Sequence, residues 1–385
     1  MKRRLVIIGA NDFQDQLIRK AKAKGYETHV FAWENGAIGA KTADFFYPIS
    51  IVEKESILEV CKKIHPVGIC SIASDLAVPT VNYIASRLGL TSNSEESSTI
   101  CTNKHSMRDA FEQNGDPSPK SILFEQEMDI NAIDVSFPVI VKPTDRSGSR
   151  GITKVENRVE LKSAVERAVK ESFEKKVLIE EFAEGEEYSV EFVSWRGKHT
   201  FLALTKKFTT GVPYFIEIGH LQPAPITPDR RDKIIRVVMH ALDSLQIQYG
   251  ASHAEVKVDA SENIKIIEIG ARMGGDCIGS DLVQISTGYD FLNMVIDISC
   301  GIPPCFQKIC EPRYAIVRFV FSEKDLECFT ILKQTHSNAF YRISPIESFD
   351  GRTVLDSAKR YGYYILATSS EEEKQEILKV VGVQA

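Results

Sequence analysis

The sequence predicts a multidomain chain of the α/β class, α+β overall. Three stretches predict this: residues 4–33 read as strand, helix and strand, residues 137–151 as a compact strand running into a glycine-rich loop, and residues 253–270 as a strand hairpin. A chain of 385 residues can hold two or three domains with their own cores. We place the domains at residues 1–100, 101–300 and 301–385.

The first third begins with a βαβ pattern. Arg4 to Ala10 reads as a buried strand, Asp12 to Lys24 as a helix, and Tyr26 to Trp33 as a second strand. Such a start is typical of a doubly wound parallel sheet. A later strand, Val67 to Ile72, leads to Asp75. An acid at the carboxyl end of a parallel strand can face a substrate, but our first interpretation of Asp75 is a cap for the helix that follows.

Composition limits the classes of function. The net charge of −6 leaves no basic surplus to neutralise phosphates, which argues against a general nucleic-acid binder. The first turn, Gly-Ala-Asn-Asp, lacks the dinucleotide glycine pattern, so a nicotinamide or flavin cofactor is not supported. No apolar run approaches the roughly 20 residues that span a bilayer, and the N-terminal run is too short for a signal peptide. We expect a cytoplasmic protein without nucleic-acid or membrane partners.

The middle of the chain carries a candidate phosphate-binding loop. A helix opens at Asn103-Lys104, and a strand from Phe137 delivers Lys142 into the loop Asp145 to Gly151. Loops of this kind present backbone N–H groups and hydroxyls to phosphate oxygens. The loop lacks the Gly-Lys-Ser/Thr ending of a Walker A motif, and an ordinary flexible hairpin turn is an equal alternative.

The hairpin at residues 253–270 places two acids face to face. With position 260 facing position 263, Glu255 lies directly opposite Glu268, and cross-strand neighbours have Cβ atoms about 5 Å apart. Like charges repel at that distance, so a positive group such as Mg2+ is expected between them. Arg272 follows, with glycines at 270, 274 and 275 that permit close backbone approach to a ligand. The alternative is a surface hairpin with two solvated glutamates.

Taken in order, these signals resemble the ATP-grasp superfamily: Lys104, Lys142 with its glycine-rich loop, then Glu180 and Glu187, then the two hairpin acids with Arg272. The resemblance is strongest from Asn103 to Asp290, moderate before it and weak after Gly301. It implies a Rossmann-like N-terminal domain, an ATP-grasp domain with a lid at about residues 117–182, and a small C-terminal α+β unit.

The resemblance implies roles for single residues. Lys104 and Lys142 would contact ATP phosphates under a lid that includes Ser147, Gly148, Ser149 and Gly151. Glu180 would accept from the adenine amino group, and Glu187 would hold the ribose. The backbone of Glu181, Phe182 and Ala183 would pair with the adenine edge.

The metal and the chemistry follow from the same resemblance. Glu255 and Glu268 would bind Mg2+ (or Mn2+), and the catalytic residues would be Arg272, Lys142 and Glu268, with Arg272 stabilising the transferred phosphoryl group. Many family members have an asparagine where this chain has Gly270, which leaves the number of ions open.

The form Glu-Ile-Gly-Ala-Arg-Met-Gly-Gly at 268–275 resembles the branch containing L-amino-acid ligases. The segment Glu217 to His220 also resembles that branch, where it lies near the acceptor pocket, although Glu217 and His220 could equally be a strand-edge acid and a satisfied turn histidine. Our expected substrate site is Asp75, Glu217, His220, Arg272 and Gly275. The expected reaction joins a small carboxylate to an amine through an acyl phosphate, with release of ADP and phosphate. The alternatives are a carboxylase-like or purine-biosynthetic ATP-grasp enzyme that uses bicarbonate or formate, and a non-catalytic ATP-binding module. The apolar C-terminal unit could support a homodimer.

Overall fold

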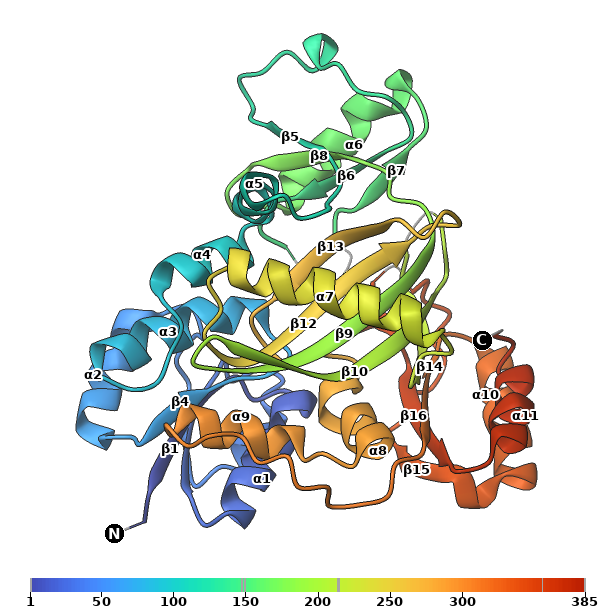
Figure 1. Ribbon diagram of the computed structural model, residues 1–385. Helices are drawn as coiled ribbons and strands as arrows, with labels where there is room; N and C mark the ends of the chain where they lie inside the picture. Colours follow the sequence, from blue (N-terminus) through green and yellow to red (C-terminus); the bar gives the residue numbers. More distant parts are fainter. Residues whose placement is uncertain (1, 147, 149, 213–214, 355, 384–385) are drawn as a thin grey trace.

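The computed structural model describes residues 2–383 apart from residues 147, 149, 213, 214 and 355. It contains three sheets, which follow one another along the chain and are visible in Figure 1 as a lower left, an upper and a central layer. The mixed α/β class predicted from the sequence is confirmed. None of the described helices is long and apolar enough to cross a membrane.

The N-terminal sheet is parallel, with strand order β3-β2-β1-β4. The βαβ start is confirmed, because α1 connects two parallel strands and its first turn is capped by the Asn11 side chain. The strands are β1 (Arg4–Ile8), β2 (Glu27–Phe31), β3 (Phe45–Tyr47) and β4 (Gly68–Cys70), with helices α1 (Asp12–Ala23), α2 (Lys54–Ile64) and α3 (Val78–Arg87). The sequence did not predict β3, which has only three residues and lies at an edge.

A pair of helices leads from this sheet into a second sheet within residues 117–182, where a lid is expected, and we call it the lid sheet. The helices are α4 (Glu95–Thr102) and α5 (Lys104–Asn114), and Asn103 caps α5 by accepting from two backbone N–H groups. The lid sheet has strand order β5-β8-β6-β7 and all its pairs are antiparallel (top of Figure 1). Its elements are β5 (Ser121–Phe124), β6 (Val139–Pro143), β7 (Thr153–Val155), α6 (Arg158–Glu171) and β8 (Val177–Glu181).

The central sheet has eight strands in the order β13-β12-β9-β10-β11-β14-β16-β15. Helix α7 (Pro228–Ser244) lies across β12, β9 and β10 in Figure 1. The strands are β9 (Glu186–Trp195), β10 (Lys198–Thr209), β11 (Glu217–Gln222), β12 (Tyr249–Val258), β13 (Ile264–Gly270), β14 (Tyr314–Val320), β15 (Phe340–Ile343) and β16 (Gly362–Thr368). The helices that follow β13 are α8 (Val283–Thr287), α9 (Phe291–Ser299), α10 (Glu323–Thr335) and α11 (Glu371–Val380).

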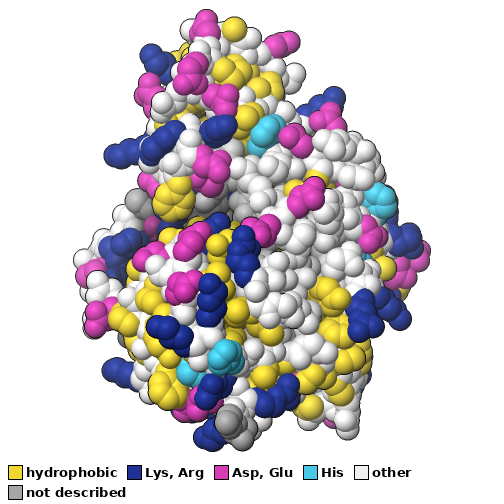
Figure 2. Space-filling model, turned by 90° about the vertical axis from the view of Figure 1, so that its left-hand side faces the viewer, with side chains coloured by type: hydrophobic (Ala, Val, Ile, Leu, Met, Phe, Trp, Pro, Cys, Tyr) yellow, Lys and Arg dark blue, Asp and Glu magenta, His cyan; other side chains and the backbone are white. Residues whose placement is uncertain are grey.

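The C-terminal unit shares this sheet. Strand β14 pairs with β11 in antiparallel register, with Gly219 opposite Arg318 and His220 opposite Val317. Residues 301–385 therefore extend the central sheet instead of forming a sheet of their own, and the division of the chain at residues 100 and 300 remains a proposal. On the face of the molecule drawn in Figure 2, acidic and basic side chains are interspersed.

The hairpin pairs Glu255 with Glu268, as predicted, but by a different register. Next to the turn, Val258 faces Ile264, one residue away from the predicted partner. A β-bulge at Ile267 restores the predicted pair. The carbonyl group of the bulged residue has a hydrogen-bond partner outside the hairpin, because Arg108 Nη2 donates to Ile267 O over 2.6 Å.

Candidate active site

The two hairpin glutamates each face a lysine. Lys207 Nζ lies 2.7 Å from Glu255 Oε1, and Lys104 Nζ lies 2.8 Å from Glu268 Oε1. These ammonium groups are the positive charges that the repulsion argument required. The alternative of two solvated surface glutamates is wrong, since both carboxylates are paired and only about a quarter exposed. Lys207, on β10, was not predicted from the sequence.

Lys207 is the centre of a cluster of three acids. Its Nζ lies 2.8 Å from Glu187 and 3.6 Å from Glu217, in addition to Glu255, and its side chain is only 3% exposed. Burial alone would lower the pKa of Lys207, but the three carboxylates outweigh burial and raise that pKa well above its ordinary value. The same ion pair, with His253, holds the pKa of Glu255 well below its usual range despite burial. Lys207 and Glu255 are therefore both ionised at neutral pH.

The donor set fits a hard divalent cation. Mg2+ in proteins is commonly bound by one or two carboxylates, with phosphate oxygens and waters completing the octahedron. Glu255 and Glu268 supply that number, and Gly270 adds no side-chain oxygen. Within the described part of the chain no group of three or more His, Cys, Asp or Glu side chains could hold a metal by itself. A cation at this hairpin would thus take its remaining ligands from the nucleotide.

A second ionic cluster joins the lid to the core. Glu180, on β8, has Lys142 Nζ 2.6 Å from one carboxylate oxygen and Arg108 Nε 2.9 Å from the other. All three side chains are buried. Burial opposes the charge of Glu180, but the two cations outweigh it and lower the pKa of Glu180. Arg108 lies one helical turn after Lys104 on α5 and was not predicted from the sequence.

These residues border a pocket between the lid and the central sheet. Its lining includes the predicted Lys142, Glu180, Glu181, Phe182, Ala183, Glu187, Glu217 and Glu255, together with the unpredicted Lys207 and Phe215. The aromatic rings of Phe182 and Phe215 lie 6.4 Å apart and give the pocket apolar faces suited to a flat base. The structure thus brings the residues predicted for adenine and ribose together with Glu255.

The glycine-rich loop connects β6 to β7, so it is a hairpin loop as well as a candidate phosphate loop. Lys104 Nζ donates to Arg146 O over 2.8 Å and ties the loop to the core. Gly148 and Gly151 both have left-handed backbones, with φ of 71° at each. The predicted Ser147 and Ser149 lie outside the described residues.

A buried pair supports the floor of the hairpin. Glu191, fully buried on β9, hydrogen-bonds to His253 Nδ1 and accepts from the backbone N–H of Gly274 over 3.0 Å. Burial alone would lower the pKa of His253, but Glu191 and Glu255 raise it to about 9. A Cβ on Gly274 would lie 2.6 Å from Glu191 Oε1, which explains the glycine.

Asp75 contacts Arg272 and caps no helix. A short turn, η2 (Asp75–Ala77), precedes α3, and neither element has a side-chain capping bond. The capping interpretation is therefore wrong. Instead Arg272 Nε and Nη2 donate to the two oxygens of Asp75 over 2.9 and 3.0 Å. The predicted role of Asp75 towards a substrate remains a prediction.

A second cavity, of about 670 Å³, is larger than the pocket between the lid and the central sheet. The N-terminal domain, the lid loop and the C-terminal unit all line it, with Trp33, Arg150, Asp276, Phe319, Arg360 and Tyr363 among its residues. Arg360 Nη2 donates to Asp276 over 2.8 Å and to Glu217 over 3.0 Å. Glu217 lines the pocket between the lid and the central sheet, so this chain of ion pairs connects the walls of the two cavities.

The remaining predicted substrate residues lie near this junction. His220 is buried, and neither ring nitrogen has a hydrogen-bond partner among the described residues. Burial, followed by the nearby Lys207, lowers the pKa of His220 to about 3, so the ring is neutral. The interpretation of His220 as a satisfied turn histidine is wrong, because it lies on β11 with its ring unsatisfied. Gly275 approaches Ala73 of the N-terminal domain, where an added Cβ would meet only an ordinary contact at 3.7 Å.

Comparison with known proteins identifies a family that matches the middle of the chain. The family described as ATP-grasp domain matches residues 135–281. The alanine–anticapsin ligase of Bacillus subtilis (strain 168) is 27% identical over 295 residues, covering 67% of this chain and 61% of that protein. The chain therefore spans less than two thirds of this curated relative.

Two solved structures share the fold over nearly the whole chain. L-amino acid ligase from Bacillus licheniformis gives a TM-score of 0.80 at 22% identity, covering 100% of this chain and 99% of that one. The biotin carboxylase domain dimer of Hydrogenobacter thermophilus 2-oxoglutarate carboxylase, in complex with MgADP, ADP and bicarbonate, gives 0.75 at 17% identity, covering 98% and 90%. The family match contains Lys142, Glu180, both hairpin glutamates and Arg272, so residues 135–281 of the chain contain an ATP-grasp domain, and the solved structures share the fold over the rest.

Proposed function

We propose that the chain is an ATP-dependent carboxylate–amine ligase that acts on an amino acid or a similar small carboxylate. The observation that carries this proposal is the junction at Glu217. Its carboxylate lines the nucleotide pocket and accepts a hydrogen bond from Arg360, which lines the 670 Å³ cavity. A phosphoryl group leaving one cavity would meet an acceptor held in the other.

The chemistry needs no protein nucleophile. A carboxylate oxygen of the first substrate attacks the γ-phosphorus of ATP, the bond to the β–γ bridging oxygen breaks, and ADP leaves. The amine nitrogen then attacks the acyl carbon, phosphate leaves, and the nitrogen gives up a proton. Lys104 and Lys142 would hold phosphate oxygens, and Arg272 would balance the charge of the transferred group. A divalent cation at Glu255 and Glu268, Mg2+ or Mn2+, would neutralise phosphate oxygens when bound.

The charges of the larger cavity favour a zwitterionic substrate. Arg360 and Asp276 present opposite charges side by side, which suits an α-carboxylate and an α-ammonium group. The relatives that the chain resembles include ligases of amino acids by name.

A homodimer formed through the apolar C-terminal unit remains a prediction, which size-exclusion chromatography with light scattering would test.

The competing function is a carboxylase-like reaction. The biotin carboxylase neighbour binds bicarbonate, as its description states. A cavity of about 670 Å³ is much larger than bicarbonate requires, and its size is in the range of sites for drug-sized ligands. This size is the reason for placing the ligase first.

The test is release of ADP and phosphate from Mg-ATP with amino acids supplied singly and in pairs. Turnover that needs two different amino acids supports the ligase, turnover with bicarbonate or formate supports the carboxylase-like function, and ATP binding without turnover supports a binding module. Glu268→Gln is expected to abolish turnover while the fold persists. Glu262→Gln, at the exposed turn of the same hairpin, is the matched control and should keep full activity. Retained turnover in Glu268→Gln would remove Glu268 from the metal site.

A further inference from the structure

The ion pair between Asp75 and Arg272 crosses from the N-terminal domain to the end of the hairpin. Both carboxylate oxygens are used, at 2.9 and 3.0 Å, and the two side chains are only 17% and 16% exposed. A two-point contact of this kind fixes the plane of the guanidinium as well as its position. Arg272 is thereby held in one orientation by a residue from another domain.

Gly270 makes room for this pair. A Cβ at Gly270 would lie 2.8 Å from Asp75 Oδ1 and 3.2 Å from the Arg272 guanidinium carbon. Gly270 is not among the glycines with a positive φ, so its backbone does not itself require glycine. The position needs glycine for space, and the space is filled by the Asp75 carboxylate.

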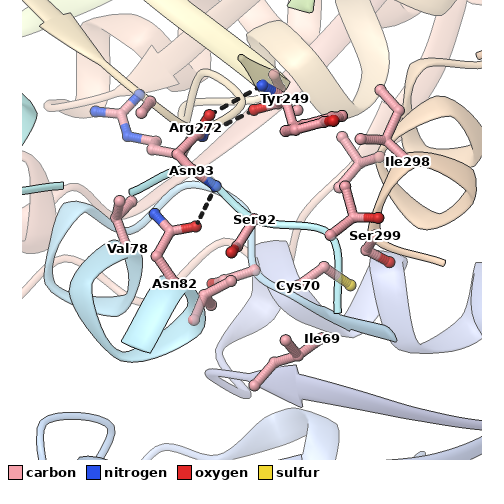
Figure 3. Close-up of a pocket in the computed structure, with 17 residues that line it drawn as sticks. Ile69, Cys70, Val78, Asn82, Ser92, Asn93, Tyr249, Arg272, Ile298 and Ser299 are labelled. Atoms are coloured by element: carbon pink, nitrogen blue, oxygen red, sulfur yellow. Dashed lines mark hydrogen bonds between the residues drawn. The ribbon is translucent and has the colours of Figure 1, made fainter. Parts of the chain in front are cut away.

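Hydrogen bonds also link the two domains beside this ion pair. The Asn93 side chain donates to Tyr249 O and accepts from Tyr249 N, each over 2.9 Å, and the Asn93 backbone N–H donates to Asn82 Oδ1 over 3.1 Å. Figure 3 shows these bonds around a small pocket that Arg272 also lines, with its guanidinium pointing away from the pocket. The backbone N–H of Ala73 donates to Met273 O over 3.2 Å. These hydrogen bonds hold the segment that carries Asp75 in place against the end of the hairpin.

Without Asp75, other acids would compete for Arg272. The charges of Glu268 and Glu191 act on the guanidinium after that of Asp75. Glu268 is a proposed metal ligand, so an arginine drawn to it would take up a carboxylate that the cation needs. The two-point contact with Asp75 keeps Arg272 and Glu268 separate.

We propose that Asp75 is a positioning residue that holds the Arg272 guanidinium beside the transferred phosphoryl group, and that Gly270 and Asp75 are a matched pair in which any side chain at 270 displaces the carboxylate. This rests on the proposed function only in that Arg272 acts on a transferred phosphoryl group, which both the ligase and the carboxylase-like reaction require.

The test is a double-mutant cycle read by binding, so that it does not depend on knowing the substrates. Calorimetry compares the affinity for Mg-ADP alone with the affinity for Mg-ADP plus aluminium fluoride, which imitates the transferred phosphoryl group. Asp75→Ala and Gly270→Ala are each expected to weaken the fluoroaluminate complex on the order of 10- to 100-fold and to leave Mg-ADP affinity unchanged. The double variant should lose little more than Gly270→Ala alone, because a Cβ at 270 acts chiefly by displacing Asp75 and only secondarily by crowding the Arg272 guanidinium.

Two further variants separate positioning from folding. Asp75→Asn keeps the shape of the side chain and should show a smaller loss in the same complex. Asp297→Asn weakens another partly buried ion pair of the same domain interface, with Lys24 at 2.8 Å, which involves neither Asp75 nor Arg272, and should bind the fluoroaluminate complex like the wild type.

Additive losses in the cycle, or a wild-type affinity in Asp75→Ala, would overturn the proposal. A wild-type chain that gains no affinity from aluminium fluoride would also overturn it. Failure of every amino-acid pair in the turnover assay would instead count against the ligase function and leave the binding cycle as it stands.

Discussion

Replacing Lys207 with methionine should cost the fold more than any other lysine substitution on β10. Its ammonium group lies 2.7 Å from Glu255, 2.8 Å from Glu187 and 3.6 Å from Glu217, and its side chain is 3% exposed. Methionine keeps the length of the side chain but leaves three partly buried carboxylates without their shared cation. Removing one partner of a buried ion pair costs about 3–5 kcal/mol, and we expect the free energy of unfolding to fall by that amount.

The sign of the pH dependence determines the pH at which this loss of stability should be measured. Because the folded pKa of Lys207 is raised above its unfolded value, its contribution is fully present below the unfolded value and is lost only as pH rises through the raised pKa. Urea unfolding at neutral pH therefore reports the whole contribution.

Lys206→Met is the matched control for this prediction. Lys206 is the preceding residue on β10, and its partner Glu186 is about half exposed. Losing a solvent-screened pair costs about 1 kcal/mol or less. Added Mg2+ should narrow the gap between the two variants, since a cation at Glu255 would replace part of the missing charge. Equal losses in Lys207→Met and Lys206→Met would refute the idea that the acid cluster depends on Lys207.

Three other changes test the rest of the site. Burial opposes ionisation of Glu180, yet Arg108 and Lys142 lower its pKa below the ordinary 4.5. The contribution of the Glu180 carboxylate to stability is therefore present above pH 4.5 and is lost as pH falls through the folded pKa. In urea unfolding, the difference in stability between the wild type and Glu180→Gln should accordingly disappear in acid. Arg108→Gln loses the contacts to Glu180 and to Ile267 O and should weaken Mg-ATP binding by calorimetry, and unchanged affinity would contradict this. Arg360→Met should raise the KM of the amino-acid substrate and not that of ATP, whereas an effect on ATP alone would place Arg360 on the nucleotide side.

The sequence predicts what depends on local pattern. The βαβ start, the strand before Lys142 and the facing glutamates were all predicted, because alternation and turn residues are encoded within a few positions. The register of the hairpin was not, since its bulge depends on Arg108, which is more than 150 residues away and bonds to the bulged carbonyl. The pair of acids was predicted correctly although the register beside the turn was wrong.

The sequence does not predict which neighbours share a site across the sheets. Lys206 and Lys207 are adjacent lysines on one strand, and alternation places them on opposite faces without saying which face holds the acids. Arg360 lies in the C-terminal unit and meets Glu217 only because β14 pairs with β11. The larger cavity has the same origin, since three segments far apart in sequence line it. A feature made by tertiary pairing leaves no local signal.

The ion pairs of the site also suggest how it accepts its ligand. Before the nucleotide binds, Glu268 is balanced by Lys104 and Glu255 by Lys207, so each proposed metal ligand already has a cation. Glu255 and Glu268 would hold a divalent cation together with the nucleotide, and Lys104, which lies beside the lid loop through its bond to Arg146 O, would then hold a phosphate oxygen. The carboxylates would thus have a positive partner with and without the ligand, which an isolated pair of glutamates would not have.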